Sequence, residues 1–332
     1  MNVKALIRRV NHTLKLHKLF PEHSRILIAC SGGPDSMALL HLLQDIAAHR
    51  HTKYKLGIAV VDHSIRPESK DEVLWLQNQV DALGLSFYTT TFDVPTLSKD
   101  LKLSEETVGR QVRYQWLNEI AHSEGYDYIA VAHHKNDQAE SILAHLIRGT
   151  GLNGLTGMAV VGNDYDIPVI RPLLDVTKAE LLAYLADRKL TYCIDSTNDD
   201  IRYQRNRIRH RIIPELESIN PNVVDAIARL GGSVSEDLAV ISDLTVQAFK
   251  RLVTIDKGEM RLSRRALRKE PLAIQRRLWQ RLVSSIDSDI TLTTAHQEQL
   301  LDIVNTGEAK TFTIKSIKVI AQCDTIKVYC KH

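Results

Sequence analysis

Short apolar runs alternate with longer amphipathic stretches along the first part of the chain. Runs rich in apolar and β-branched residues predict strands at residues 25–30, 55–61, 86–91, 128–132 and 167–170. Apolar positions at helical spacing, with start and stop signals, predict helices at residues 2–20, 37–43, 68–83, 104–123, 141–147 and 178–188. Strands that alternate with helices are typical of an α/β protein with a doubly wound parallel sheet.

The pattern changes in the second part of the chain. Residues 221–283 have the apolar spacing of a helical bundle with one buried side. Residues 311–314 and 325–329 alternate between apolar and polar positions, which predicts two strands. We therefore predict an α/β domain over residues 1–215 and a smaller, mainly helical domain over residues 216–332, closed by a β-hairpin.

The first predicted strand leads directly into a glycine turn and a helix. The turn is Ser31-Gly32-Gly33-Pro34-Asp35-Ser36. Adjacent glycines let the backbone approach a ligand closely, and proline suits the first turn of a helix. Free N–H groups and the helix dipole then favour an anion at this position. No lysine follows the glycines and the spacing is not GxGxxG, so the two best-known phosphate loops do not match.

Polar residues also follow two other predicted strands. Asp62 and His63 end the second strand, where they equally fit a turn and a surface position. The fourth strand runs into 133–140, which contains His133, Asp137 and Glu140. Ligands bind at the carboxyl ends of strands in open α/β sheets, so these side chains are candidate functional residues. The histidines lack further ligands at the spacing of a zinc site.

Arginines cluster locally although the total charge is small. Two of them, Arg110 and Arg113, lie three positions apart on a predicted helix. Arg148 precedes a glycine-rich stretch that we interpret as a mobile loop, either a lid or a substrate clamp. The strongest basic segment contains Arg202, Arg205, Arg207, Arg209 and Arg211. Such a segment is either a solvated face or a phosphate-binding surface, and its excess of arginine favours phosphate.

Composition narrows the class of protein. The chain has 332 residues, 44% hydrophobic and 25% charged, and a formal net charge of +3, all ordinary for a globular protein. Its four cysteines show no CxxC spacing, so no zinc or redox pair is indicated. The sequence has neither a signal peptide nor an apolar run of membrane-spanning length. We expect a soluble cytoplasmic protein that does not contact a membrane.

Several stretches together resemble a known enzyme family. The SGGPDS turn is similar to the loop of the PP-loop ATP pyrophosphatases, which have an adenine nucleotide α-hydrolase-like fold. Further stretches in order resemble the tRNA(Ile)-lysidine synthase family. They are 61–69; Glu106 with Arg110 and 113–114; 132–134 with Asp137, Gln138 and Glu140; 148–151; 171–174; and Asp195, Asn198 and 205–214.

The resemblance implies an ATP-dependent ligase. Such an enzyme adenylates carbon 2 oxygen of the wobble cytidine in a tRNA(Ile) with a CAU anticodon, and L-lysine then displaces AMP to give lysidine. ATP and Mg²⁺ are the implied cofactors, and the tRNA and L-lysine the implied partners. A homodimer is one oligomeric state that this reading allows.

The resemblance also implies roles for individual residues. The loop residues Ser31, Gly32, Gly33, Pro34 and Ser36 would bind ATP, while Asp35 would be catalytic and would place Mg²⁺. Other roles are open: His133 or Asp137 would accept a proton from lysine, Asp137 and Glu140 would hold its cationic group, and Asp137 would be a second magnesium ligand. The tRNA or the adenylate would be bound by Arg110, Arg113, Arg148 and Arg205, and the helical domain over residues 216–332 would also bind the tRNA.

Some features depart from the family, and other readings compete with it. Asn136 stands where the family usually has aspartate, which questions any role for a second carboxylate there. Many members have a further C-terminal module, so this chain resembles a shorter form or a truncated one. A tRNA thiolase would need paired cysteines, and an amidotransferase a glutaminase or a cysteine-based triad. A non-enzymatic tRNA-binding protein would be expected to lose the loop residues, which are all present here.

Overall fold

The computed structural model describes residues 3–48, 53–64, 68–162, 165–194, 204–256, 258–306 and 308–330. Internal contacts divide the chain into two compact units, residues 1–232 and 233–332. The division lies inside the long helix α11 (Val223–Leu252), later than the domain boundary that we expected from sequence. The family-like residues Asp195 and Asn198, and Arg202 of the basic segment, lie outside the described residues.

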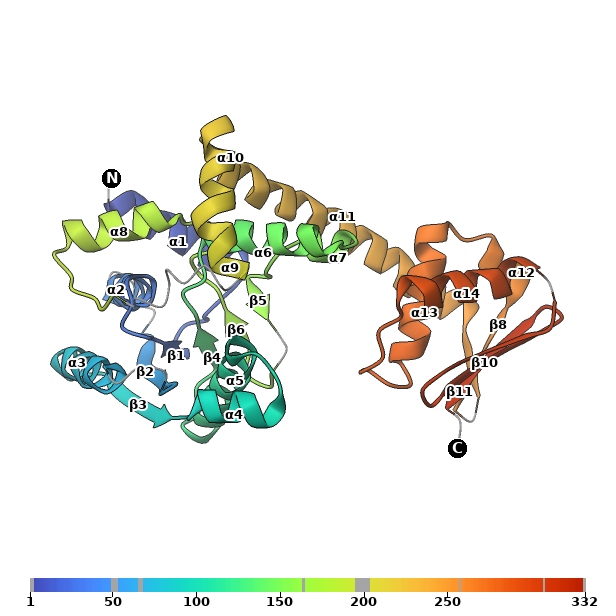
Figure 1. Ribbon diagram of the computed structural model, residues 1–332, viewed down its shortest axis with the longest axis horizontal. Coiled ribbons are helices and arrows are strands. Elements are labelled where there is room, and N and C mark those ends of the chain that lie inside the picture. Colours follow the sequence, from blue (N-terminus) through green and yellow to red (C-terminus); the bar gives the residue numbers. More distant parts are fainter. Residues whose placement is uncertain are drawn as a thin grey trace. The chain divides into compact units, whose positions relative to one another are not determined.

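Unit 1 contains a six-stranded sheet with the order β3-β2-β1-β4-β6-β5 (Figure 1). The strands are β1 (Arg25–Ala29), β2 (Lys55–Asp62), β3 (Ser86–Thr91), β4 (Tyr128–Ala130), β5 (Val161–Gly162) and β6 (Val169–Ile170). All neighbours pair in parallel except β5 with β6. The chain builds outward from β1 in both directions, so the switch point of the topology lies between β1 and β4. Ligands of open α/β sheets bind at this point.

Helices cover both faces of the sheet, because alternate residues of the central strand point to opposite sides. Ile26 and Ile28 pack on a core shared with α1 (Val3–Leu16), α2 (Pro34–Ala48), α3 (Ser69–Ala82) and α8 (Lys178–Asp187). Leu27 packs on the other side against α5 (Glu105–Ser123). These three layers confirm the predicted doubly wound α/β architecture.

Two predicted loops contain helical structure instead. The polar stretch before Ser104 contains α4 (Val94–Leu101), which begins with the Asp93 side chain accepting a hydrogen bond from the Thr96 N–H at 3.1 Å. Helix α6 (Lys135–Arg148) begins well before the predicted residue 141. Asp137 and Glu140 therefore lie on a helix rather than in a loop.

The rest of unit 1 is helical and follows the sheet. It comprises α7 (Leu152–Leu155), α9 (Gln204–Arg207), a π-helical turn (Ile208–Ile212), α10 (Ile213–Ile219) and the first part of α11. Ile208 and Ile213 are buried and pack on Ala139 of α6, together with Val224. This apolar cluster holds the basic segment against α6.

Unit 2 contains an antiparallel sheet of five strands, ordered β7-β8-β11-β10-β9. The strands are β7 (Thr254–Asp256), β8 (Glu259–Ser263), β9 (Lys310–Ile314), β10 (Ile317–Gln322) and β11 (Thr325–Cys330). Both predicted terminal strands form, as β9 and β11, and β10 lies between them and makes an antiparallel hairpin with each. The helices α12 (Arg264–Arg268), α13 (Leu272–Ser284) and α14 (Thr294–Thr306) share an apolar core with this sheet.

Several arginines of unit 2 have structural roles. Arg268 donates to the carbonyl oxygen of Val304 at the end of α14, and Arg281 lies 5.2 Å from the ring centroid of Phe249. Hydrogen bonds to the last carbonyls of a helix stabilise its end. Some of the basic residues of unit 2 therefore stabilise the fold of the unit through contacts within it. Within the described residues, no helix is both long and apolar enough to span a membrane.

Candidate functional site

The turn after β1 has the backbone shape of an anion-binding loop. Gly32 has φ +79°, the left-handed region that glycine adopts without strain. Its carbonyl oxygen accepts a hydrogen bond from the N–H of Cys193 at 2.9 Å, which fixes the turn from the far side. Pro34 then begins α2, whose first turn also contains Asp35.

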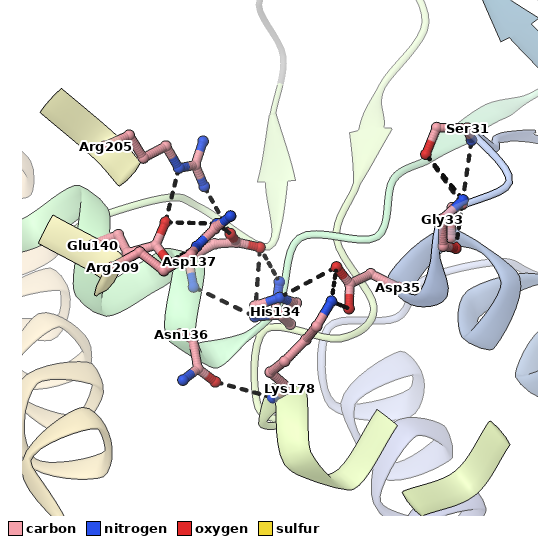
Figure 2. A network of polar contacts seen from close by, with 11 residues as sticks. Ser31, Gly33, Asp35, His134, Asn136, Asp137, Glu140, Lys178, Arg205 and Arg209 are labelled. Carbon is pink, nitrogen blue, oxygen red and sulfur yellow. Dashed lines mark hydrogen bonds and ion pairs between the residues drawn. The ribbon is translucent and has the colours of Figure 1, made fainter. Parts of the chain in front are cut away.

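Two serine hydroxyls hold the inside of this turn. Ser36 Oγ donates to the carbonyl oxygen of Gly33 at 2.9 Å and accepts from the Ser31 N–H at 3.2 Å. Ser31 Oγ accepts from the Gly33 N–H at 3.4 Å (Figure 2). These N–H contacts to neutral hydroxyls are long, and an anionic oxygen is a stronger acceptor for the same groups. The turn is thus prepared to bind an anion at the start of α2.

Asp35 connects the turn to two other elements. Both of its carboxylate oxygens accept from Lys178 Nζ of α8, at 2.6 and 2.7 Å. Its Oδ2 also lies 3.6 Å from His134 Nε2, as Figure 2 shows. Burial opposes ionisation of the carboxyl, but His134 and Lys178 outweigh it and lower the pKa of Asp35. Its side chain is 29% exposed, so it remains open to a ligand.

His134 lies between two carboxylates at the start of α6. It caps the helix: the Asp137 carboxylate accepts from the His134 N–H at 3.0 Å, and His134 Nδ1 accepts from the Asp137 N–H at 3.4 Å. Nδ1 accepts there, and Nε2 is the ring nitrogen that faces Asp35. Sequence reasoning selected His133 and missed this residue. Helix starts are recognised in sequence by serine, threonine, aspartate or asparagine at the N-cap, so a histidine in that position gave no signal.

The acidic side chains of α6 pair with arginines of the basic segment. Arg205 contacts Glu140 Oε2 at 2.9 Å and Asp137 Oδ1 at 2.8 Å. Arg209 contacts both oxygens of Glu140, at 2.7 and 2.9 Å, and Asp137 Oδ1 at 3.2 Å. Figure 2 shows both guanidinium groups directed at the two acids. We call these four residues the acid–arginine cluster.

The two acids of the acid–arginine cluster are withdrawn from water, whereas the side chains of Arg205 and Arg209 are 37% and 33% exposed. The side chain of Glu140 is 1% exposed and that of Asp137 is 9% exposed. Burial raises the pKa of Asp137, but the charges of His134 and Arg205 dominate and lower it to about 2. Arg205 and Arg209 therefore do not form part of a solvated face, which was one of the two readings of this segment. Both face inward because buried carboxylates must be paired.

His133 and Arg113 line the same region from β4 and α5. Burial lowers the pKa of His133 to about 3; Asp137 opposes this, while the positive charges of Arg171, Arg205 and Arg113 add to it. The ring is therefore neutral at neutral pH, and its Nδ1 is buried without a hydrogen-bond partner among the described residues.

The remaining predicted arginines differ in position. Arg110 and Arg113 stack on the ring of Tyr114, at 4.8 and 5.6 Å from its centroid. Arg113 is also charge-coupled to Arg205, which places it beside the acid–arginine cluster. Arg148 lies at the far end of α6, about 16 Å from Asp137 along the helix axis. The structure thus groups Arg113 with Arg205 and leaves Arg148 apart.

A magnesium ion fits one of the two predicted ligands. Mg²⁺ is usually held by one or two carboxylates together with substrate phosphates, which suits the partly open Asp35 beside the turn. Asp137 does not fit, because Arg205, Arg209 and the His134 N–H already occupy its oxygens and the imidazole separates it from Asp35. Among the described residues, no group of three or more His, Cys, Asp or Glu side chains could hold a metal.

Asn136 has a role that does not need a charge. Its Oδ1 accepts a hydrogen bond from the backbone N–H of Lys178 at 2.9 Å. The carbonyl oxygen of Val176 accepts from the Lys135 N–H at 2.8 Å, so the first turns of α6 and α8 are tied together twice. Asn136 thereby positions Lys178 beside Asp35.

A lysine-free glycine loop at the switch point of a parallel sheet defines a PP-loop protein, and the model of the PP-loop domain family matches residues 4–216. Curated relatives are named tRNA(Ile)-lysidine synthase. One from Thermosipho africanus is 39% identical over 74% of this chain and 56% of its own length. One from a Nostoc species is 33% identical over 84% of this chain and 83% of its own. The chain therefore belongs to the tRNA(Ile)-lysidine synthase family, as the sequence motifs predicted.

Coverage and structural likeness add two facts. The chain spans about half the length of the first relatives it matches, 56% and 48% for those from Thermosipho africanus and Porphyromonas gingivalis. A U34-tRNA thiolase from Methanococcus maripaludis has a TM-score of 0.61 and 20% identity, covering 70% of this chain and 78% of that chain. At that identity the likeness concerns the fold alone.

Proposed function

We propose that this protein joins L-lysine to carbon 2 of the wobble cytidine in a tRNA(Ile) with a CAU anticodon, using ATP. One observation carries the proposal beyond family membership. The anion-ready turn at Ser31–Ser36 and a buried pair of acids lie on either side of His134, at the switch point of the sheet. This arrangement provides one place for a triphosphate and, next to it, one place for a cation.

In the first step the turn binds the β- and γ-phosphates of ATP. The N–H groups of the turn and the start of α2 face the charge that grows on the leaving pyrophosphate. Asp35 would hold Mg²⁺, which neutralises phosphate charge when bound. The carbon 2 oxygen of cytidine attacks the α-phosphorus, the bond to the β-phosphate oxygen breaks, and pyrophosphate leaves. Lys178 Nζ, already beside Asp35, is positioned to donate to a phosphate oxygen.

In the second step the amine of lysine attacks carbon 2 of the adenylated base. The carbon–oxygen bond breaks, AMP leaves with that oxygen, and the nitrogen loses a proton. Asp137 and Glu140 suit a cationic substrate, because each now binds guanidinium groups that the ammonium group of lysine would replace. A pKa of about 2 for Asp137 and about 3 for His133 makes both weak bases in this state. We therefore assign Asp137 and Glu140 to binding the cation and leave proton acceptance to water.

The arginines would then serve the nucleic acid. Arg205 belongs to the acid–arginine cluster and Arg113 lies near it, where both suit the phosphate of the adenylate or of the RNA. Arg110 lies on the same ring of Tyr114 and would act with them. Arg148 suits a more distant contact with the RNA, since it lies at the other end of α6.

Nucleoside analysis tests the proposal. The protein is incubated with ATP, L-lysine and the CAU tRNA, and the digested RNA is analysed by mass spectrometry. We expect lysidine in place of cytidine, dependent on both ATP and lysine. Incorporation of sulfur, or no change of the cytidine at any enzyme concentration, would contradict the proposal. A tRNA with a different wobble base provides the control.

A further inference from the structure

The basic segment presents three different faces to its surroundings. Residues four positions apart lie on one side of a helix, so this segment carries three such rows. Arg205 and Arg209 face the acids of α6. Ile208 and Ile212 face apolar residues. The third row, Arg207 and Arg211, is exposed and has neither a hydrogen bond nor an ion pair among the described residues.

A small cavity lies beside this third row. It has a volume of about 170 Å³ and lies between the end of α6 and the basic segment. Its lining is formed by Ile147, Gln204, Arg207, Ile208, Arg211 and Ile212. Three isoleucines form the apolar part, the two arginines stand beside them, and none of the described lining residues is acidic. Nothing in the two-step reaction described above uses this cavity.

We propose that this cavity binds one base of the RNA strand that neighbours the cytidine in the site, while Arg207 and Arg211 contact the phosphates on either side of that base. The proposal rests on the proposed function, since it takes the RNA to enter beside Arg205. Single-stranded RNA is commonly bound by apolar or planar side chains that receive an unstacked base. An apolar lining receives a base without reading its edge, so this site would hold the strand rather than select its sequence.

Charge and position favour RNA over a protein partner. Within the part of the chain that the structure describes, the guanidinium groups of Arg207 and Arg211 have no ion-pair partner, and the apolar space that they flank has no carboxylate in its lining. Residues four apart on a helix lie about 6 Å from each other, on the scale of successive phosphates in an extended strand. Arg148, exposed and next in sequence to Ile147, adds a third positive charge at the end of α6. The cavity and the acid–arginine cluster share one helical segment, so a bound strand reaches both.

Binding of an RNA hairpin with a CAU loop tests the phosphate contacts. The double variant R207E/R211E is compared with R8E/K15E, which makes the same charge change at two exposed positions of α1. We expect R207E/R211E to bind the hairpin at least about tenfold more weakly. The slope of the logarithm of the binding constant against the logarithm of the salt concentration should fall in magnitude by about 2. The control should stay within about twofold of the unchanged protein. Equal affinity for R207E/R211E and the control would overturn the proposal.

A fluorescent base tests the cavity itself. Hairpins carry 2-aminopurine at either neighbour of the cytidine, and the emission is measured with the unchanged protein and with I147W, whose larger side chain fills the cavity. We expect one of the two hairpins to change its emission on binding, and I147W to abolish that change. If neither hairpin responds, or if I147W responds as the unchanged protein does, the base is elsewhere and the proposal fails. In that case the proposal fails even if Arg207 and Arg211 contribute to RNA binding, or if the surface binds a protein instead.

The outcomes also separate this inference from the proposed function. Lysidine formation by the unchanged protein tests the reaction, whereas the comparison between variants tests the cavity. If the hairpin binds through Arg207 and Arg211 but no lysidine forms, the reaction is wrong and the cavity stands. If lysidine forms and R207E/R211E has the same KM for the tRNA as R8E/K15E, the cavity is wrong and the reaction stands. A protein that binds no hairpin but forms lysidine on the whole tRNA contradicts the cavity and leaves the reaction standing.

Discussion

Asp35 receives positive charge from Lys178 and His134 while it remains partly open to solvent. Its pKa is lowered, so the carboxylate is ionised throughout the neutral range. A carboxylate at the first turn of α2 beside an anion-ready turn would repel a phosphate unless a cation lies between them. Lys178 supplies such a cation within the chain, and Mg²⁺ is the further one that the proposed reaction requires.

Replacing Asp35 tests its assigned role. D35N keeps the shape of the side chain and removes the charge that would hold Mg²⁺. We expect AMP formation to fall at least about 10²-fold, the size of a lost electrostatic contact in a transition state. Binding of the CAU tRNA should change less than about twofold, because Asp35 faces the nucleotide. Radiometric AMP assays and filter binding measure the two quantities, and normal AMP formation by D35N would refute the role.

Asn136 provides a second test at a single residue. N136D retains an oxygen that accepts from the Lys178 N–H, whereas N136A removes it. We expect N136D to keep its free energy of unfolding within about 0.5 kcal/mol and N136A to lose about 1 kcal/mol. Denaturant titration measures both. A large loss in N136D together with none in N136A would show that this hydrogen bond does not matter.

His133 makes stability depend on pH. Its pKa of about 3 in the folded protein lies below the ordinary value, so the unfolded chain binds more protons between these two values. Stability therefore rises with pH across that window and is lost as the pH falls. Between pH 6.5 and pH 5 this one histidine lowers the free energy of unfolding by about 2 kcal/mol. We expect H133Q to have a shallower dependence than the unchanged protein, and identical slopes in denaturant titrations would contradict this.

At the scale of elements, two helix starts position the site. His134 begins α6 and Thr177 begins α8, each with a reciprocal capping arrangement with the third helical residue. The box at Thr177 is readable from sequence, because threonine and glutamate stand at the expected spacing. The corresponding arrangement of His134 with Asp137 is not readable from sequence, because histidine is not a usual N-cap residue. The polar residues that follow it also hide the apolar spacing of the first turns of α6. Sequence reasoning consequently placed Asp137 and Glu140 correctly at the sheet edge but in a loop.

Pairing between α6 and the basic segment is measurable as a coupling energy. Arg209 and Glu140 form two hydrogen bonds, and Glu140 is 1% exposed. Removing only the arginine leaves Glu140 with less compensation, so R209Q should destabilise the protein by about 2 kcal/mol. The double variant R209Q/E140Q should recover part of this loss. A coupling energy of about 1–3 kcal/mol in the cycle is expected, and a value near zero would mean that the pair is not formed in solution.

At the scale of the molecule, local patterns were sufficient for some features and not for others. Alternation of strands and helices, the glycine turn and its place after a buried strand were all readable from residues near one another in sequence. The order of strands was not, since pairing of β1 with β2 and β4 depends on contacts between distant segments. Strand β10 is a separate case: it adjoins β9 and β11 in sequence and pairs with both, so long-range contacts do not explain why it was not predicted. The inward direction of Arg205 depends on acids that are far away in sequence.

The division into units has a consequence for how the parts act. Every residue of the candidate site lies in unit 1, within the range matched by the PP-loop domain family. Unit 2 has its own apolar core around Trp279 and uses Arg268 and Arg281 within its fold. We propose that unit 2 contributes to holding the tRNA while unit 1 performs the chemistry. The expected result is that substitutions on the exposed side of unit 2 change the KM for tRNA and leave the KM for ATP unchanged.

The path of one oxygen atom tests the central claim most directly. The CAU tRNA is prepared with oxygen-18 at carbon 2 of its wobble cytidine and incubated with the protein, ATP and L-lysine, and the AMP is analysed by mass spectrometry. Because that oxygen attacks the α-phosphorus and leaves with it, the account predicts one oxygen-18 in each AMP formed with lysidine. AMP free of the label, with the oxygen released to water or kept in the RNA, would contradict adenylation of the base.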